Sequence, residues 1–183
     1  MPHYKKLVGE KCYLSPCSPE DAEKWAAWDN DPEVTIPLGD EAYTLYSLEA
    51  EQQSIAGIQK SHDTVFSILD LATDEVIGRG MLFDIRRVDR CAMLGIVIGE
   101  KAYWNRGYGQ EATRLLLEFG FNGLNLENIM LGVFSFNERA IACYRKVGFR
   151  EIGRRRQSRI IGEKKYDVVF MDMLAEEFRA IKT

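Results

Sequence analysis

Apolar residues recur along the chain with two different periods, and the change of period separates helices from strands. A short strand, Cys12–Leu14, comes first. Ser18-Pro19-Glu20-Asp21 then predicts a helix start, because serine is a good N-cap, proline suits the first helical position and acids suit the first turn. Apolar residues at near-helical spacing follow until Asn30-Asp31-Pro32 ends this helix. A second, more polar helix is predicted over residues 47–60.

From residue 64 the pattern changes to β-rich runs separated by short polar links. Strands are predicted over 64–71, 76–85 and 91–99, and the short links favour antiparallel meander pairing. They are followed by alternating elements, predicted as helix 108–122, strand 128–136, helix 138–147 and strands 150–158 and 165–174. A strand–helix–strand crossover of this length implies that 91–99 and 128–136 form a parallel pair. Without an internal repeat or linker, residues 1–183 are expected to form one α/β domain with helices on both faces of a mixed sheet.

Composition narrows the class of protein further. The chain has 183 residues, with 24 basic and 28 acidic side chains, which argues against a nucleic-acid partner and favours a cationic substrate. Its four cysteines form no CxxC pair and there are two histidines, so neither a metal site nor a disulfide framework is expected. No signal peptide and no apolar run of about 18 residues is present, so we expect a cytoplasmic protein without membrane contact.

The segment most suggestive of chemistry joins a strand to a helix. The buried strand Ile96–Ile98 leads into Arg106-Gly107-Tyr108-Gly109, which opens the helix over 108–122. Glycines at such a turn let the backbone approach a ligand, and the free N–H groups and helix dipole favour an anion such as a pyrophosphate. Taken alone, a glycine pair here is more often only a turn. Ala112 stands where a dinucleotide-binding GxGxxG motif needs glycine, and the GK[ST] of a P-loop is missing.

A second element lies about thirty residues further on. Asn137 is a good N-cap and Gly148 a good C-terminal residue for the helix between them. Asn137, Ala140 and Tyr144 share one face of that helix, because they lie three, four or seven residues apart. An amide, a small residue and a phenol therefore point the same way. The alternative is that Tyr144 is an ordinary core residue with its hydroxyl at the rim.

Together the two elements resemble the acetyl-CoA-binding core of GNAT acetyltransferases. The similarity is closest to the branch with ribosomal-protein N-terminal acetyltransferases and spermidine N-acetyltransferases. Five segments carry it in the expected order, namely Trp28–Val34, Tyr103–Ala112, Asn125–Ile129, Asn137–Phe149 and Ile161–Val168 with Met171. The resemblance implies the GNAT fold, a mixed, mostly antiparallel sheet of about seven strands with one splayed parallel pair.

The resemblance also implies an activity: transfer of acetyl from acetyl-CoA, as co-substrate, to a primary amine by direct attack in a ternary complex. The amine would be a protein N-terminus, a polyamine or another small amine. Carried over residue by residue, the backbone of Val97, Ile98 and Gly99 would bond the pantetheine arm, which Asn137 would also touch. The pyrophosphate would be wrapped by Asn105, Arg106, Gly107, Tyr108, Gly109 and Gln110. Tyr144 matches the tyrosine that protonates the leaving thiolate.

Two departures from the family pattern matter. Trp104 stands where the loop usually has Gln or Arg, and Gly132 stands where some N-terminal acetyltransferases place a glutamate. A base is still needed, because an alkylamine with a pKa near ~10 is almost wholly protonated at pH 7. Candidates by position are Glu33, Glu41, Asp84 and Asp167, of which Glu33, Glu41 and Asp167 are also predicted to contact the substrate. The acids between Asp29 and Glu41 favour a cationic acceptor.

Other interpretations stay open at this point. A catalytically silent sensor or scaffold that binds acyl-CoA would keep the same loop glycines. The basic run over residues 154–159 is interpreted as a solvated sheet edge rather than a nucleic-acid surface. A homodimer is compatible with the resemblance.

Overall fold

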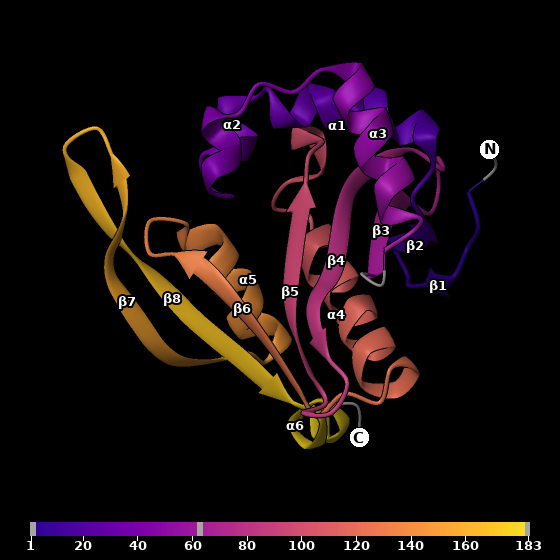
Figure 1. Cartoon of the computed structure of the whole chain (residues 1–183). Coiled ribbons are helices and arrows are strands. Elements are labelled where there is room, and N and C mark those ends of the chain that lie inside the picture. Colours follow the sequence, from indigo (N-terminus) through magenta and orange to yellow (C-terminus); the bar gives the residue numbers. More distant parts are fainter. Residues whose placement is uncertain (1–2, 62–63, 182–183) are drawn as a thin grey trace.

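One mixed sheet of eight strands runs through the molecule in the order β1-β2-β3-β4-β5-β6-β8-β7 (Figure 1). The computed structural model describes residues 3–61 and 64–181. The strands are β1 (Leu7–Val8), β2 (Cys12–Pro16), β3 (Thr64–Asp70), β4 (Val76–Arg86), β5 (Cys91–Ile98), β6 (Asn128–Phe134), β7 (Arg150–Ile161) and β8 (Lys164–Leu174). Seven were predicted, and the eighth is the two-residue β1. This confirms the predicted fold class.

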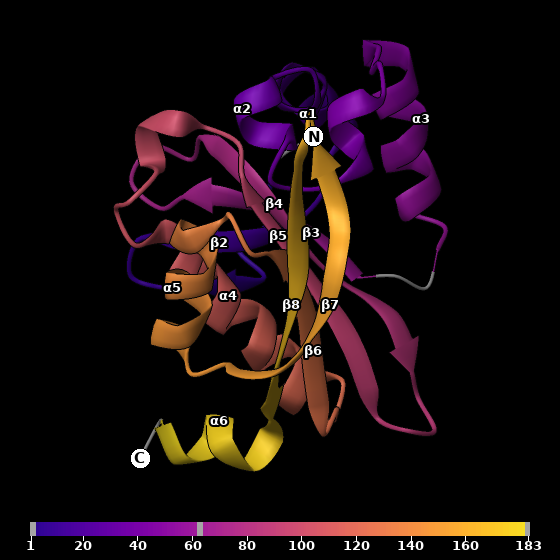
Figure 2. The same ribbon diagram turned by 90° about the vertical axis from the view of Figure 1, so that its left-hand side faces the viewer.

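The helices lie at the two ends of the sheet and against its faces. They are α1 (Ala22–Asp29), α2 (Pro32–Thr35), α3 (Leu48–Ile58), α4 (Tyr108–Glu118), α5 (Glu138–Val147) and α6 (Ala175–Ile181). Three 3₁₀ turns are η1 (Pro19–Asp21), η2 (Asp40–Tyr43) and η3 (Lys101–Tyr103), and a π turn, η4 (Phe119–Gly123), continues α4. In both views α1, α2 and α3 cluster at one end of the sheet and α6 lies at the other (Figures 1 and 2).

Successive side chains of a strand point to opposite faces of the sheet, and apolar side chains form one hydrophobic cluster on each face. In β2, Cys12 and Leu14 join a core that includes residues of α4 and α5, whereas Tyr13 between them joins a core with Trp25 of α1 and Ile55 of α3. The period of two in a strand turns neighbouring side chains to opposite faces. Helices therefore cover both faces, as predicted.

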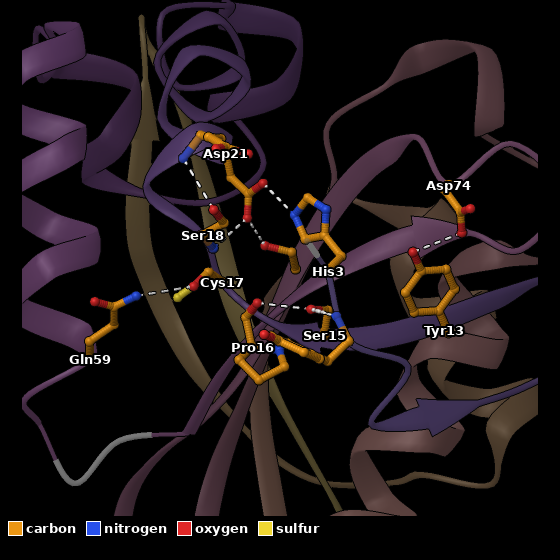
Figure 3. Close-up of polar contacts among 12 residues, drawn as sticks. His3, Tyr13, Ser15, Pro16, Cys17, Ser18, Asp21, Gln59 and Asp74 are labelled. Carbon is orange, nitrogen blue, oxygen red and sulfur yellow. Dashed lines mark hydrogen bonds and ion pairs between the residues drawn. The ribbon is translucent and has the colours of Figure 1, made fainter. Parts of the chain in front are cut away.

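The entry into the first helix is held by a small buried polar cluster (Figure 3). Ser18 caps the turn and forms a reciprocal capping box with Asp21, which confirms the predicted helix start. The Asp21 carboxylate also accepts hydrogen bonds from the Ser67 hydroxyl of β3 and from His3 Nε2, the latter at 2.8 Å. The N-terminal segment is thereby tied to the sheet below α1.

The predicted parallel pair is present, and it is short. β5 and β6 pair in parallel only from Cys91↔Asn128 to Met93↔Met130. Beyond that point β5 stays with β4 as far as Gly78↔Ile98, while β6 follows β8 as far as Phe134↔Val168. The two strands therefore diverge toward their carboxyl ends, with β6, β7 and β8 leaning away from the rest of the sheet (Figure 1).

Candidate functional site

A cavity of about 780 Å³ opens where β5 and β6 diverge. Its lining comes from β4, β5, β6, the loop before α4, helices α4 and α5, and the segment that carries α2 and η2. Many of the residues predicted for the site meet here, namely Val97, Ile98, Asn105, Gly107, Gly109, Gln110, Asn137 and Tyr144. The candidate glycine loop and the candidate phenol, far apart in sequence, thus face one space.

Three predicted cofactor residues are placed outside this lining. Arg106 is exposed, and its guanidinium donates to the carbonyl of Ala102 at 3.3 Å. The side chain of Tyr108 points away and donates from its hydroxyl to Asp70 at 2.6 Å. Gly99 is buried against the ring of Trp28, which a β-carbon at this position would overlap.

The backbone of β5 explains which of its residues face the diverging gap. The N–H of Gly99 donates to the carbonyl of Ile77 on the β4 side at 2.9 Å. Successive residues of a strand turn their backbone groups alternately to its two sides, so Val97 and Gly99 face β4. The backbone groups of Ile96 and Ile98 therefore face the gap. Of the predicted positions Val97, Ile98 and Gly99, Ile98 stays a candidate for strand-like bonding to a ligand, and Ile96 joins it.

The loop before α4 has the backbone of an anion cradle. Asn105 and Gly107 adopt left-handed conformations, with φ of 60° and 90°, and Gly107 is the N-cap of α4. The N–H groups of Tyr108, Gly109 and Gln110 occupy the first turn, where an α-helix offers them no internal acceptor. The helix dipole adds positive potential at this end. This confirms the predicted turn, and it provides donors suited to a phosphate.

Aromatic side chains hold the loop in place. Tyr103 donates to Glu75 at 2.9 Å, and the indole N–H of Trp104 donates to the carbonyl of Ile98 at 2.6 Å. The hydrogen bond from Tyr108 to Asp70 raises the pKa of the Tyr108 phenol to about 12. The loop is therefore organised before any ligand arrives, which lowers the entropic cost of binding.

Helix α5 begins and ends as the sequence predicts. The side-chain oxygen of Asn137 accepts the N–H of Ala140 at 3.1 Å, and Gly148 ends the helix with φ of 119°. Two turns after Asn137, Tyr144 reaches the cavity while only 8% of its surface is exposed. Burial raises the pKa of its phenol above the ordinary value, so the hydroxyl keeps its proton.

Two cations on α5 were not found by sequence reasoning. Arg139 lies over the ring of Trp104, with its guanidinium carbon 3.8 Å from the ring centroid, and Lys146 lines the same cavity. Arg139 and Lys146 lie seven residues apart and so share a face of α5, but nothing in the local sequence distinguishes them from surface charge. With the donors of α4, these cations fit a polyanionic ligand such as CoA.

The four candidate carboxylates are dispersed, and one of them lines the cavity. That one is Glu41 of η2. Glu33 lies 2.6 Å from Lys101 and does not line the cavity. Asp84 is exposed near the end of β4, and Asp167 accepts the backbone N–H of Gln157 at 2.9 Å.

Other kinds of site find little support in residues 3–61 and 64–181. No group of three or more His, Cys, Asp or Glu in this part of the chain is placed to hold a metal ion. Its four cysteine thiols are free. None of its helices is both long and apolar enough to cross a bilayer.

Comparison with known proteins decides the family. Residues 11–150 match the model of the acetyltransferase (GNAT) domain. The chain belongs to the GNAT acetyltransferase family. As a member of this family it is an acetyl-CoA-dependent N-acetyltransferase.

Relatives and solved structures agree with this assignment. The chain is 28% identical to N-acetyltransferase p20 of Bacillus licheniformis, over 94% of this GNAT chain and 97% of the relative. A shorter match, 39% identical over 41% of the chain and 40% of the relative, is to spermidine N(1)-acetyltransferase of Escherichia coli. The spermidine N-acetyltransferase of Vibrio cholerae, solved with CoA and spermine, shares the fold with a TM-score of 0.83 at 22% identity, over 92% and 98% of the two chains.

Proposed function

We propose that this GNAT enzyme acetylates a primary amine by direct attack in a ternary complex, with Tyr144 as the general acid. The observation that carries the proposal is the shared cavity: the Tyr144 side chain and the first turn of α4 both line it, at the divergence of β5 and β6. When bound, acetyl-CoA supplies an activated acetyl thioester. The buried, protonated phenol at Tyr144 Oη supplies the proton that the thiolate leaving group needs.

The backbone of β5 supports the same proposal. Ile96 and Ile98 present the gap-facing peptide groups, in the position where an extended ligand can add to the strand. A gap-facing N–H at this edge also supplies a donor for the negative charge that develops on the carbonyl oxygen. The first turn of α4 holds the phosphates at the other end of the cavity.

Glu41 is the proposed proton acceptor for the incoming ammonium. Position 132, where some relatives would place a glutamate, is a glycine that lines the cavity and brings no carboxylate. Glu41 lines the same cavity. A carboxylate here can bind the ammonium and accept its proton, which leaves the nucleophilic amine.

Direct attack is favoured over a covalent acetyl-enzyme. Cys143 also lines the cavity, beside Tyr144 in sequence. Burial raises the pKa of its thiol to about 11, so it stays neutral near pH 7. Since the thiolate is the nucleophilic form, Cys143 is a poor acetyl acceptor.

The test follows release of free thiol from acetyl-CoA in the presence of a panel of primary amines and short peptides. For Tyr144→Phe we expect kcat to fall by ~10²-fold or more, the usual size of a general-acid effect, with little change in affinity for CoA. Tyr4→Phe is the matched control, because Tyr4 is exposed on the N-terminal segment. A fall of less than about threefold would remove the acid role from Tyr144. Tight CoA binding with no thiol release from any amine or peptide would favour a silent sensor.

A further inference from the structure

The half of the cavity away from α4 and α5 has an apolar wall made by cross-strand neighbours. Met81 on β4 pairs with Gly95 on β5, and Phe83 pairs with Met93. All four line the cavity. They lie on the face opposite to Leu82 and Leu94, which are buried in the core shared with α4 and α5. This wall therefore belongs to the side from which an acceptor would approach.

Glycines on both diverging strands let apolar neighbours form the surface of this half of the cavity. A β-carbon on Gly95 would lie 3.3 Å from Met81 and 3.5 Å from Phe83, so these two side chains extend over the glycine. Gly132 of β6 also lines the cavity, and it is exposed. A β-carbon on Gly132 would lie 3.2 Å from Val168 and 3.6 Å from Phe170, so apolar neighbours form the surface beside both glycines. Apolar residues of α2 and the turn after it contribute the remaining wall, namely Val34, Pro37 and Leu38.

Few charged side chains line the half of the cavity away from α4 and α5. Among the described residues that line the cavity, Glu41 is the one acid. Arg79 is the nearest cation along β4, and it forms an ion pair of 2.8 Å with Asp29, whose side chain is nearly fully buried. The net result is one carboxylate facing an apolar chamber.

The acids near Glu41 form ion pairs within the protein, and Asp31, Glu33 and Asp40 do not line the cavity. Lys101 lies 2.7 Å from Asp31 and 2.6 Å from Glu33, and its hydrogen bond lowers the pKa of the Asp31 carboxyl. Asp40 lies 3.5 Å from Arg159. A polyamine carries several positive charges, and each charge removed from water needs its own partner. The cavity provides one such partner, the Glu41 carboxylate.

From these observations we infer that the acceptor is a primary monoamine with a bulky apolar substituent, aryl or branched alkyl, and not a polyamine. The ammonium would be recognised by Glu41 and the substituent by Met81, Phe83 and Met93. This inference rests on the proposed function, since it names the acceptor for the same site. Apolar contact area then determines which amines are accepted.

The first experiment measures thiol release from acetyl-CoA with 2-phenylethylamine, 3-methylbutylamine, ethanolamine, putrescine and spermidine, and with short peptides. We expect kcat/KM for 2-phenylethylamine to exceed that for ethanolamine and for spermidine by ~10-fold or more. Preference for spermidine, or release with peptides alone, would overturn the inference and leave the proposed function intact. Release with none of them would overturn both.

The second experiment changes the wall and the carboxylate separately. Phe83→Ala should lower kcat/KM for 2-phenylethylamine ~10-fold or more and change that for ethanolamine less than about twofold. Phe83→Leu should give a smaller loss in the same direction, and it keeps the inference testable if the alanine variant does not fold. Val88→Ala, at a position 96% exposed, is the control. Equal losses for both amines would show that Phe83 does not contact the substituent.

For the carboxylate, Glu41→Gln should raise KM for every charged amine ~10-fold. It should also lower kcat, because the proposed proton acceptor is lost, without changing the order of preference among the amines. Glu49→Gln, on the exposed face of α3, is the matched control. An unchanged KM for the amines in Glu41→Gln would contradict the recognition role.

Discussion

At the scale of single residues, the protonation of Tyr144 is set by its surroundings. Its side chain is buried between α5 and the sheet, and its ring packs edge-on against Phe149 with a centroid distance of 5.8 Å. Burial disfavours the charged phenolate, which raises the pKa of the phenol. The neutral phenol is the form that can donate a proton, so the acid form persists above the ordinary tyrosine pKa of about 10.

This leads to a prediction for the pH dependence of catalysis. From pH 6 to 10, kcat/KM for an alkylamine should rise as the free amine loses its proton, and Tyr144 should cause no fall. The measurement is a pH profile with 2-phenylethylamine, repeated in D₂O. A falling limb below pH 9 that disappears in Tyr144→Phe would contradict the raised pKa.

Trp104 carries a second prediction at this scale. Trp104→Phe removes the N–H that donates to the Ile98 carbonyl, while an aromatic ring remains beneath Arg139. Loss of one hydrogen bond of about 1 kcal/mol should raise KM for acetyl-CoA about fivefold and leave kcat nearly unchanged. Arg155→Lys, on the exposed edge strand, is the control. A fall in kcat with constant KM would show that Trp104 acts on the chemical step.

Sequence reasoning found the residues whose local role has a local signal. Asn137 and Gly148 are recognisable as caps, and Gly107 as a helix-start glycine, because backbone geometry requires those residue types. It did not find Met81 or Phe83. Their place in the cavity depends on the register between β4 and β5, which sequence alone leaves open.

At the scale of elements, Gly99 shows how a glycine next to a site can serve packing. Its position leaves no room for a β-carbon beside the buried ring of Trp28. Gly99→Ala should therefore lower the free energy of unfolding by about 1–3 kcal/mol, the usual cost of overpacking. Urea unfolding is the measurement.

The control for this prediction is Gly57→Ala in α3. A β-carbon there meets nothing within 4 Å, so alanine should stabilise the helix by about 0.5–1 kcal/mol. If Gly99→Ala folded with wild-type stability but lost affinity for acetyl-CoA, the glycine would belong to the cofactor site instead.

The elements missed from sequence are short ones. Asn30-Asp31-Pro32 was interpreted as a helix end, yet Asp31 also caps the four-residue α2, with Pro32 at its first position. Helix α6 follows β8 directly at Ala175, with neither a glycine nor a proline between them. A seven-residue helix offers too few turns for its period to stand out from a strand.

At the scale of the whole molecule, Arg159 connects the leaning β7–β8 hairpin to the segment that covers the cavity. It is 6% exposed, donates to the Gly39 carbonyl at 2.7 Å, and lies about 5 Å from the rings of Tyr43 and Phe134. The basic run was interpreted as a solvated edge. Residues 154–156 are indeed exposed, but this interpretation was wrong for Arg159.

This connection predicts an effect on the acceptor alone. Arg159→Lys loses the planar guanidinium that spans the two rings and the carbonyl, so the segment carrying Glu41 should be held less firmly. KM for 2-phenylethylamine should rise about threefold to tenfold, since a net loss of about 1 kcal/mol corresponds to about fivefold, while KM for acetyl-CoA stays constant. Arg156→Lys, at an exposed position on the same strand, is the control. An equal rise in both KM values would mean that the hairpin supports the whole cavity.

The most direct test of the central claim is a crystal structure of the enzyme with CoA. We expect the diphosphate on the N–H groups of Tyr108, Gly109 and Gln110, the pantetheine arm along Ile96 and Ile98, and the sulfur within hydrogen-bonding distance of Tyr144 Oη. A complex with CoA bound elsewhere, or with Tyr144 Oη turned away from the sulfur, would contradict the account.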